Sequence, residues 1–430
     1  MRTRNVCTGT TLLIAALFAG AAQAAPPYSA AAPAMALEKP AIGWPSQDPA
    51  LGERDWREAN ETVGRFERGH IDLLRWEADN LPKADAPGDS RPQLTAGAAV
   101  RAALAQRPAL FATSGMNAQE RALADITVVE LAREVQQAWI GAVTAEAALR
   151  NAEREFEAAS VADELAARMT AAGNWGRDRL IAKRLDLADT AVAVVQARHA
   201  ALAAREALVR VAGLSGEAAE FSLPLALPPL PQTTASGDGI EAAAVHAHPV
   251  LAVLSAEAER AERALSQGDR ALWQAASEAA LPYAADAALP SAAPFIDLRR
   301  TPLSHDLQRA VRTRAEATML AVRVRSQVRE AWHGVASAHE VATLLRERAL
   351  PLATEREDDM VLRYNGMLKS TWDLIDATRE RIAAESAALE SERDFWLAHI
   401  NLQAVLAGAE HVGGGRGVAR STRGAAAGGH

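Results

Sequence analysis

A long stretch without helix-breaking residues is the feature that most constrains this chain. From Ala118 to Ala172 there is no proline, and Gly141 is the only interior glycine. Apolar residues recur every seven positions in two series, Val135, Ala142, Leu149 and Phe156, and Leu131, Ala138, Ala145, Ala152 and Ala159. This is the a/d pattern of a coiled coil, whose small residues let helix axes approach closely. We expect a single helix about 80 Å long, given the rise per residue of an α-helix.

A second long helix returns from the end of the first. Gly173 and Gly176 interrupt the heptad pattern, and a run of more than 30 residues without glycine or proline then reaches Gly213. Ordinary globular helices average about 11–12 residues. The region therefore predicts a long antiparallel helical hairpin.

The same pattern occurs again in the C-terminal half. A helix is expected from about Ser304 to Arg363, with an interruption at Pro351, and a return helix is expected to reach Gly408. Trp139 precedes Gly173 by 34 residues, and Trp332 precedes Gly366 by the same number. Matched Xaa-Pro steps, Arg107-Pro108 and His248-Pro249, precede the two hairpins. Shared spacings and residue types indicate a tandem duplication.

These patterns predict a mainly α fold with tandem-repeated long antiparallel helical hairpins and little or no β-strand content. Aromatic residues make up only 4% of the chain, whereas strands favour aromatic and β-branched residues. Four long helices can close into a four-helix bundle or associate with copies of the chain, and the periodicity leaves both open. The expected regions are a signal peptide at 1–24, a Pro/Ala-rich lead-in with amphipathic helices at 25–94, the first hairpin repeat at 95–214, a linker at 215–239, the second hairpin repeat at 240–408 and a disordered tail at 409–430.

The N-terminus has the three parts of a secretory signal. Arg2 and Arg4 supply positive charge, residues 10–22 are apolar, and Ala22-Gln23-Ala24 forms a cleavage site. The single cysteine, Cys7, lies within this segment, so the mature chain is expected to have no disulfide. No later apolar run reaches the roughly 18–20 residues of a membrane helix.

Charge and motifs exclude several classes of function. The net charge of -8 argues against nucleic-acid binding, which calls for basic surfaces. We find no nucleophile elbow, P-loop or dinucleotide fingerprint, so we predict neither an enzyme nor a cofactor. His246 and His248 are two residues apart, which places them on different sides of a helix. We therefore expect no metal site there.

The turn of the second hairpin resembles a family motif. Residues 363–374 read Arg-Tyr-Asn-Gly-Met-Leu-Lys-Ser-Thr-Trp-Asp-Leu, which is similar to the Tyr-x-x-Gly-x-x-Ser-x-x-Asp-Leu turn of the TolC-like outer-membrane efflux proteins. The duplication, the His248-Pro249 step and the signal peptide are also similar to that family. The resemblance implies a homotrimeric channel with a helical tunnel, whose hairpin tips dock on a periplasmic adaptor linked to an inner-membrane pump. It also implies passive conduction and β-strands contributed to a shared barrel.

The chain departs from the family pattern at both hairpin turns and at both places where strand pairs are expected. The spacing from Gly366 to Ser370 is one residue longer than in the family turn, and Gly176 stands where the first copy would have serine. The interval between Leu110 and Ala118 leaves no room for a strand pair, and residues 281–300 could hold one short pair at best. We therefore expect a divergent member with reduced or missing barrel strands.

The two hairpin turns are the expected docking and gating sites. The residues concerned are Gly173, Trp175, Asp178, Tyr364, Gly366, Ser370, Asp373 and Leu374. Gly173 and Gly366 are expected to cap their helices in the left-handed conformation, and Asp373 to cap the return helix. Tip carboxylates could also form a cation-attracting ring, from Asp178, Asp358, Asp359 and Asp373. Trp139 and Trp332 are expected to be packing residues.

Two functions remain open. The first is the channel component of a tripartite efflux system, exported to the outer membrane and periplasm of a Gram-negative-type cell. The alternative is a soluble periplasmic helical scaffold or binding protein derived from the same family, with no channel of its own. A periplasmic adaptor is disfavoured because it would need β-rich domains around a single hairpin.

Overall fold

A computed structural model describes residues 91–234, 236–279 and 304–412. The expected signal peptide, the lead-in helices of residues 51–80, the region considered for a strand pair at 281–300 and the tail beyond Val412 lie outside these residues.

The described residues are predominantly helical, and the only β-pairing among them is an isolated bridge between Gln93 and Ser222. The first repeat comprises α3 (Ala96–Ala105), η2 (Pro108–Phe111), α4 (Ala118–Ala171) and α5 (Arg177–Ala212). After η3 (Gly216–Ala219), the second repeat comprises α6 (Ile240–Ala247), α7 (Pro249–Arg263), α8 (Gln267–Ala279), α9 (His305–Leu344), η4 (Leu345–Ala349), α10 (Leu350–Asn365) and α11 (Thr371–Leu406). The predicted mainly α fold with two long hairpins is confirmed.

The long helices begin at polar caps. The Asn117 side chain accepts from the Glu120 backbone N–H, and the Glu120 carboxylate accepts from the Asn117 N–H, which completes a capping box. Ser304 caps α9, and Ser370 caps α11, through side-chain oxygens that accept from the backbone. Each cap satisfies backbone donors that a helix start would otherwise leave unpaired.

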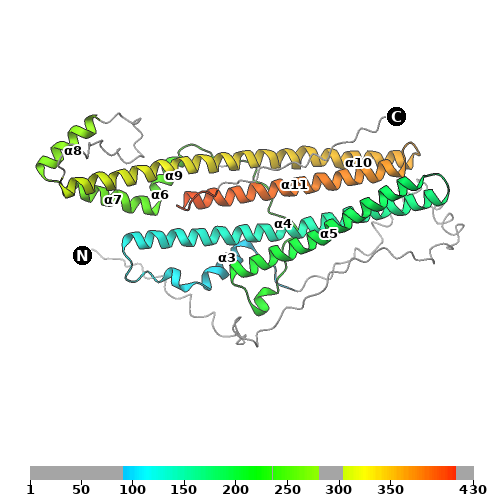
Figure 1. Cartoon of the computed structure of the whole chain (residues 1–430), viewed down its shortest axis with the longest axis horizontal. Helices are drawn as coiled ribbons and strands as arrows, with labels where there is room; N and C mark the ends of the chain where they lie inside the picture. Colours follow the sequence, from blue (N-terminus) through cyan, green and yellow to red (C-terminus); the bar gives the residue numbers. More distant parts are fainter. Residues whose placement is uncertain (1–90, 235, 280–303, 413–430) are drawn as a thin grey trace, which may run out of the picture.

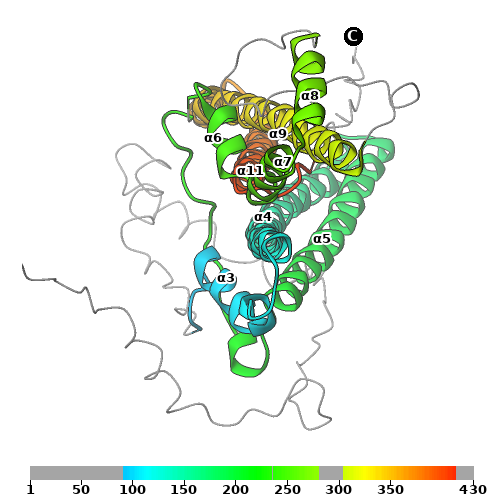
Figure 2. The same cartoon turned by 90° about the vertical axis from the view of Figure 1, so that its left-hand side faces the viewer.

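The long helices form an open row. In the order of packing, α5 contacts α4, α4 contacts α11, and α11 contacts both α9 and α10. Figure 1 shows the helices running side by side along the molecule, and Figure 2 shows α5 and α9 at opposite edges with α4 and α11 between them. Of the two arrangements that the periodicity left open, the described chain does not adopt the closed four-helix bundle.

Two hydrophobic cores stabilise the row at the end away from the hairpin turns. One lies between α3, α4 and α5 and includes Val135 and Leu208, both fully buried. The other lies between α6, α9 and α11 and includes Val328 and Phe395, also fully buried. Burial of side chains of this size is the main favourable contribution to folding.

The matched tryptophans anchor the short helices of the two repeats. Trp139 is buried, and its Nε1 donates to the Leu94 carbonyl at 2.8 Å, just before α3. Trp332 lies against Gly237, just before α6, so closely that a Cβ at Gly237 would be 3.0 Å from the ring. The prediction that both are packing residues is confirmed, and the parallel placement supports the duplication.

The interruption expected at Pro351 takes the form of a π-helical turn. Residues 345–349 form η4, in which the Leu350 N–H donates to the Leu345 carbonyl five residues back. A π-turn inserts one extra residue into a helix. It lies directly before Pro351, whose ring and missing N–H are incompatible with a regular α-helical turn.

The start of the second repeat contains one helix boundary that the sequence pattern does not predict. The pattern of residues 240–274 predicts a break only at His248-Pro249, but a second break at residues 264–266 separates α7 from α8. His248 begins α7 as a cap, because its Nδ1 accepts from the Leu251 N–H. Burial lowers the pKa of His248, in keeping with a neutral ring that accepts this hydrogen bond.

Candidate docking and gating site at the hairpin tips

The first tip closes with glycine in the left-handed conformation. α4 ends at Ala171, Ala172 is its C-cap, and Gly173 follows with φ of +78°. The Asn174 N–H donates to the Met169 carbonyl at 2.9 Å, and the Gly173 N–H donates to the Thr170 carbonyl at 3.0 Å. This is a Schellman-type end, which glycine makes without steric strain.

The second tip has the same pattern of hydrogen bonds, but its left-handed residue is not glycine. Gly366 is the C-cap of α10 and keeps a negative φ of −77°. Met367 adopts φ of +57°, and the Leu368 N–H donates to the Arg363 carbonyl at 2.9 Å. The prediction that Gly366 adopts the left-handed conformation is therefore wrong, since Met367 adopts it instead.

An alignment that pairs Gly173 with Gly366 therefore places the two tips one residue out of register. Gly173 corresponds in conformation to Met367, so the second copy has one more residue between its tryptophan and its tip. The π-turn at 345–349 accommodates that extra residue within the helix. The return helices α5 and α11 are equal, with 36 residues each.

The return helices start differently at the two tips. Gly176 precedes α5 without a side-chain cap, and a Cβ there would collide with the Asp178 carboxylate. Ser370 precedes α11 in a capping box with Asp373, as predicted for Asp373. The Ser370 backbone N–H and hydroxyl donate to the Asp373 carboxylate at 3.0 and 2.8 Å. These hydrogen bonds, with a smaller contribution from Lys369, lower the pKa of Asp373.

A stack of two tryptophans joins the tips. The rings of Trp175 and Trp372 are stacked, with centroids 4.5 Å apart and planes 16° from parallel. Arg179 lies over Trp175 at 5.5 Å and Lys183 over Trp372 at 5.3 Å, both from α5. The stack with its two flanking cations connects the first tip to the start of α11.

The second tip exposes more apolar surface than the first. Met367 is 93% exposed and Leu368 77% exposed, and Leu362 and Tyr364 are exposed nearby. Apolar side chains held on a narrow protruding turn favour contact with another molecule. The first tip has Gly173 and Asn174 at the positions that correspond to Met367 and Leu368.

Behind the tips, arginines connect the two hairpins. Arg379 of α11 binds Asp186 of α5 at 2.6 Å and Glu155 of α4 at 3.3 Å. Burial alone would lower the pKa of Arg379, but its hydrogen bonds and charge interactions with the two carboxylates outweigh burial and raise that pKa. A single guanidinium therefore ties three helices together.

A second set of ion pairs extends to α10. Arg154 of α4 binds Glu385 of α11, and Arg381 binds both Glu385 and Glu357 of α10. Burial opposes the charge on Arg381, yet the two carboxylates raise its pKa. With Arg379, these pairs connect α4, α5, α10 and α11 on the tip side of the row.

The structure brings some of the predicted site residues into contact with other parts of the chain. Trp175 meets the second hairpin through Trp372, a residue of the recognised turn that the predicted site did not include. Asp359 pairs with Arg363 at 2.8 Å, and Asp373 with Lys369 at 3.5 Å. The carboxylate ring remains a prediction, as do the docking roles of Tyr364, Gly366 and Leu374 on the second tip.

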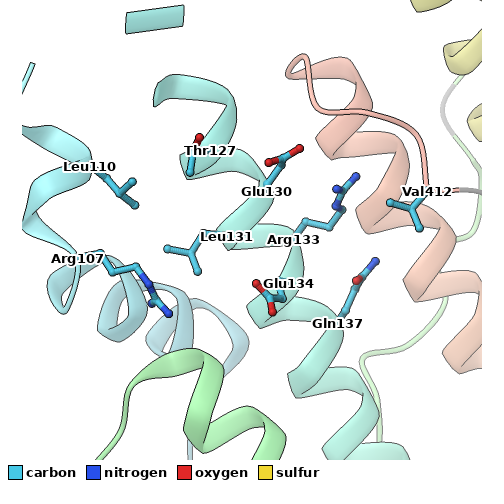
Figure 3. Close-up of a pocket in the computed structure, with 9 residues that line it drawn as sticks. All are labelled: Arg107, Leu110, Thr127, Glu130, Leu131, Arg133, Glu134, Gln137 and Val412. Carbon is cyan, nitrogen blue, oxygen red and sulfur yellow. The ribbon is translucent and has the colours of Figure 1, made fainter. Parts of the chain in front are cut away.

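A pocket of about 520 Å³ lies at the opposite end of the row. It is formed by η2, α4 and the C-terminal segment at Val412, as Figure 3 shows. Arg107 on its wall donates to the Val211 carbonyl, and Arg133 donates to the Glu410 carbonyl. Both guanidinium groups therefore hold the chain together, and the pocket is remote from the tips.

In the described ranges, no helix combines the length and apolarity needed to cross a membrane. The same ranges hold no group of three or more His, Cys, Asp or Glu side chains placed to bind a metal ion.

Comparison with known proteins finds similarity among solved structures. CusC, whose structures concern folding and transmembrane channel formation, has a TM-score of 0.46 and 15% identity over 72% of this chain and 74% of CusC. The outer-membrane channel OprN has a TM-score of 0.46 and 18% identity over 73% and 72% of the two chains. The MtrE outer membrane channel of Neisseria gonorrhoeae has a TM-score of 0.44 and 17% identity over 73% and 72%. No family model and no curated protein matches the sequence.

Proposed function

We propose that this chain is one subunit of a homotrimeric channel that conducts substrate passively as the outer component of a tripartite efflux system. It is exported to the outer membrane and periplasm, and its hairpin tips dock on a periplasmic adaptor linked to an inner-membrane pump. The observation that carries the proposal is an apolar coiled-coil face on α5 that the described part of the chain leaves exposed.

The exposed face of α5 has heptad spacing. Its large apolar residues are Ile181, Leu185, Val192, Val195 and Leu202. Ala188 and His199 complete a series with alternating intervals of four and three residues, and both are exposed. Such a series is the a/d seam of a coiled coil, which is stable in water when another helix covers it. The face belongs to a helix at the edge of the row, where a neighbouring molecule can reach it.

The other edge of the row offers a partner surface. α9 and α10 expose apolar residues there as well, namely Met319, Val322, Val341, Leu344 and Leu352. Contact between the α5 edge of one subunit and the α9–α10 edge of the next is heterologous, because the two surfaces differ. Heterologous contacts whose rotation closes generate rings. A ring of hairpins encloses a tunnel lined by helices.

Cysteine cross-linking tests the ring directly. Val192 on α5 and Leu352 on α10 lie at similar distances from their tips, and Cys7 of the expected signal peptide is the only native cysteine. We expect the double variant Val192→Cys, Leu352→Cys to give a covalent trimer on oxidation. The matched control, Ala193→Cys with Leu352→Cys, moves the first thiol off the apolar face and should give little product.

A charge on the face provides a second test. Val192→Glu should convert the trimer to monomer in light scattering, whereas Ala193→Glu should leave it unchanged. A wild-type chain that stays monomeric in buffer and in detergent would contradict the ring and favour the alternative, a periplasmic helical scaffold. Separation of inner and outer membranes on a density gradient then distinguishes an outer-membrane channel from a periplasmic protein.

A further inference from the structure

A buried asparagine fixes the last described residues against the long helices. Gly408 turns the chain after α11, with φ of +99°. The Asn401 side chain of α11 then pairs with the backbone of Val412. Its Oδ1 accepts from the Val412 N–H at 3.3 Å, and its Nδ2 donates to the Val412 carbonyl at 3.2 Å. Asn401 is only 6% exposed, and hydrogen bonds shielded from water are stronger electrostatically.

Two further contacts hold the same segment. Arg133 of α4 donates to the Glu410 carbonyl at 2.6 Å, and His411 Nε2 lies 3.5 Å from the carboxylate of Glu330 on α9. Side chains of three long helices, α4, α9 and α11, therefore hold these residues. The chain beyond Val412 starts at a position that the fold determines, away from the hairpin tips.

That position is the wall of a pocket. Val412 is 54% exposed and lines the pocket of about 520 Å³ beside η2 and α4 (Figure 3). Leu110 and Leu131 supply further apolar surface. The volume lies in the range of about 300–1,000 Å³ that is usual for ligand pockets. A pocket large enough for side chains of another segment therefore lies next to the point where the described chain ends.

Two carboxylates in this pocket have no partner. Glu130 and Glu134 lie one turn apart on α4, and both line the pocket. Within the part of the chain that the structure describes, neither side chain forms an ion pair or a hydrogen bond. Arg107 and Arg133 donate instead to backbone carbonyls. Like charges four residues apart destabilise a helix, so a cation bound between the two carboxylates is favourable.

The sequence beyond Val412 supplies cations and no acids. Residues 413–430 include Arg416, Arg420 and Arg423, and neither Asp nor Glu. The first three are glycines, whose lack of a side chain lets the backbone turn back toward α4 without a steric clash. Four residues span at most about 14 Å. Arg416 can therefore reach the carboxylates of the pocket that Val412 lines.

We propose that the pocket is the docking site of the chain's own C-terminal tail, residues 413–430. The Arg416 guanidinium binds between the carboxylates of Glu130 and Glu134. A guanidinium donates in a planar fork that fits carboxylate oxygens, and attachment at Val412 gives the tail a high effective concentration. The docked tail links η2 and α4 of the first repeat to the end of α11. This contact lies within one chain, so it does not rest on the proposed channel or its ring.

Disulfide trapping tests whether the tail enters the pocket. Thr127 lines the pocket, Gly417 follows Arg416, and the only native cysteine is Cys7 of the expected signal peptide. Thr127→Cys with Gly417→Cys should form a disulfide within one chain on mild oxidation, detected as a linked peptide by mass spectrometry. In the control, Asp125→Cys with Gly417→Cys, the first thiol is exposed on the opposite side of α4 and should give little product.

Proteolysis tests the ion pair itself. Trypsin cleaves after arginine, so cleavage after a docked Arg416 should be slower than cleavage after Arg423. The double variant Glu130→Gln with Glu134→Gln keeps the side-chain shape and removes the charge. It should accelerate cleavage after Arg416 by about tenfold. Glu157→Gln, at an exposed carboxylate farther along α4, is the matched control and should leave this rate unchanged.

Three results would overturn the proposal. The first is an equal disulfide yield in the two double cysteine variants. The second is a cleavage rate after Arg416 that does not change when both carboxylates are neutralised. The third is a disulfide that forms only between separate chains, one with Thr127→Cys and one with Gly417→Cys, which would assign the pocket to the tail of another copy. The substitutions lie outside both apolar cores, and circular dichroism checks that each variant keeps its helices.

Discussion

The two ends of the same long helices are held together by different forces. Away from the tips, large apolar residues such as Trp139, Val328 and Phe395 fill two cores. Toward the tips, the buried residues of α4 are small, and include Ala159 and Ala166. Arginine–carboxylate pairs connect the hairpins there. The end with apolar cores should be rigid, whereas the end with ion pairs should open at lower cost and depend on salt.

The largest effect should come from the apolar end. Phe395 is fully buried and packs against His339, Trp396 and His399. Phe395→Ala should reduce the free energy of unfolding by about 3–5 kcal/mol, because it removes apolar contacts and leaves a cavity. Denaturant unfolding measures this, with Phe395→Leu as the milder control. A loss near zero would show that this core does not stabilise the row.

Removing the ion pairs of Arg379 should affect only the tip end of the long helices. Arg379→Met should lower the free energy of local opening by about 1–3 kcal/mol, because Asp186 and Glu155 lose their shared cation. Hydrogen exchange should increase in tip-side peptides of α4, α5 and α11 and stay unchanged near Phe395. The more exposed pair of Arg356 with Glu380 is the control, and Arg356→Met should have little effect.

Raising the salt concentration distinguishes the forces at the two ends of the long helices without a mutation. Raising ionic strength to about 1 M shortens the Debye length to about 3 Å, which weakens partly exposed ion pairs. Exchange should then accelerate in the tip half and slow slightly, or stay constant, in the apolar cores. Equal acceleration at both ends would refute this division of forces.

Loss of the tryptophan stack should have a smaller effect. Trp372→Ala should cost about 0.5–1.5 kcal/mol beyond the change in buried area, because the stacked contact with Trp175 is lost. The near-ultraviolet circular dichroism of the paired indoles should fall, and exchange at residues 172–176 should rise. Trp372→Phe keeps an aromatic ring and should restore most of the protection. An unchanged spectrum in Trp372→Ala would show that the rings are not stacked in solution.

The smallest effect is expected at the cap of α11 and depends on pH. The pKa of Asp373 is lowered from 3.8 in the folded chain, so its contribution to stability is present above about 3.8 and is lost as pH falls through the lower folded value. Asp373→Asn should therefore reduce protection of the second tip at neutral pH, and this difference should vanish in strong acid. A difference that persists in strong acid would show that the effect of Asp373→Asn does not come from the charge of the carboxylate.

Periodicity predicts the long helices well because each is a local pattern. The ends of α4, α5 and α11 fall within a few residues of the glycines that mark them, and Ser304 caps α9 where the helix is expected to begin. Contacts between distant segments are not predictable in this way. The stacking of Trp175 on Trp372 and the hydrogen bond from Trp396 to the Pro228 carbonyl depend on how the hairpins lie in space, which no single segment specifies.

Residue type alone predicts the wrong left-handed residue at the second tip. Glycine is the residue expected at a left-handed position, which favours Gly366 over Met367. Aligning the two copies by counting residues conceals the offset, because the extra residue lies in the helix before the tip. The boundary between α7 and α8 escapes prediction for a similar reason, since no proline or glycine lies at the break at residues 264–266.

The π-turn has a consequence for the predicted duplication. An insertion of one residue in a continuous helix rotates every later side chain by about 100°, which would turn the seam away from its partner. Because residues 345–349 take up the extra residue in one wide turn, the side chains beyond it keep their orientation. If the two hairpins arose by the predicted duplication, the π-turn lets the second copy change length while its tip stays beside that of the first.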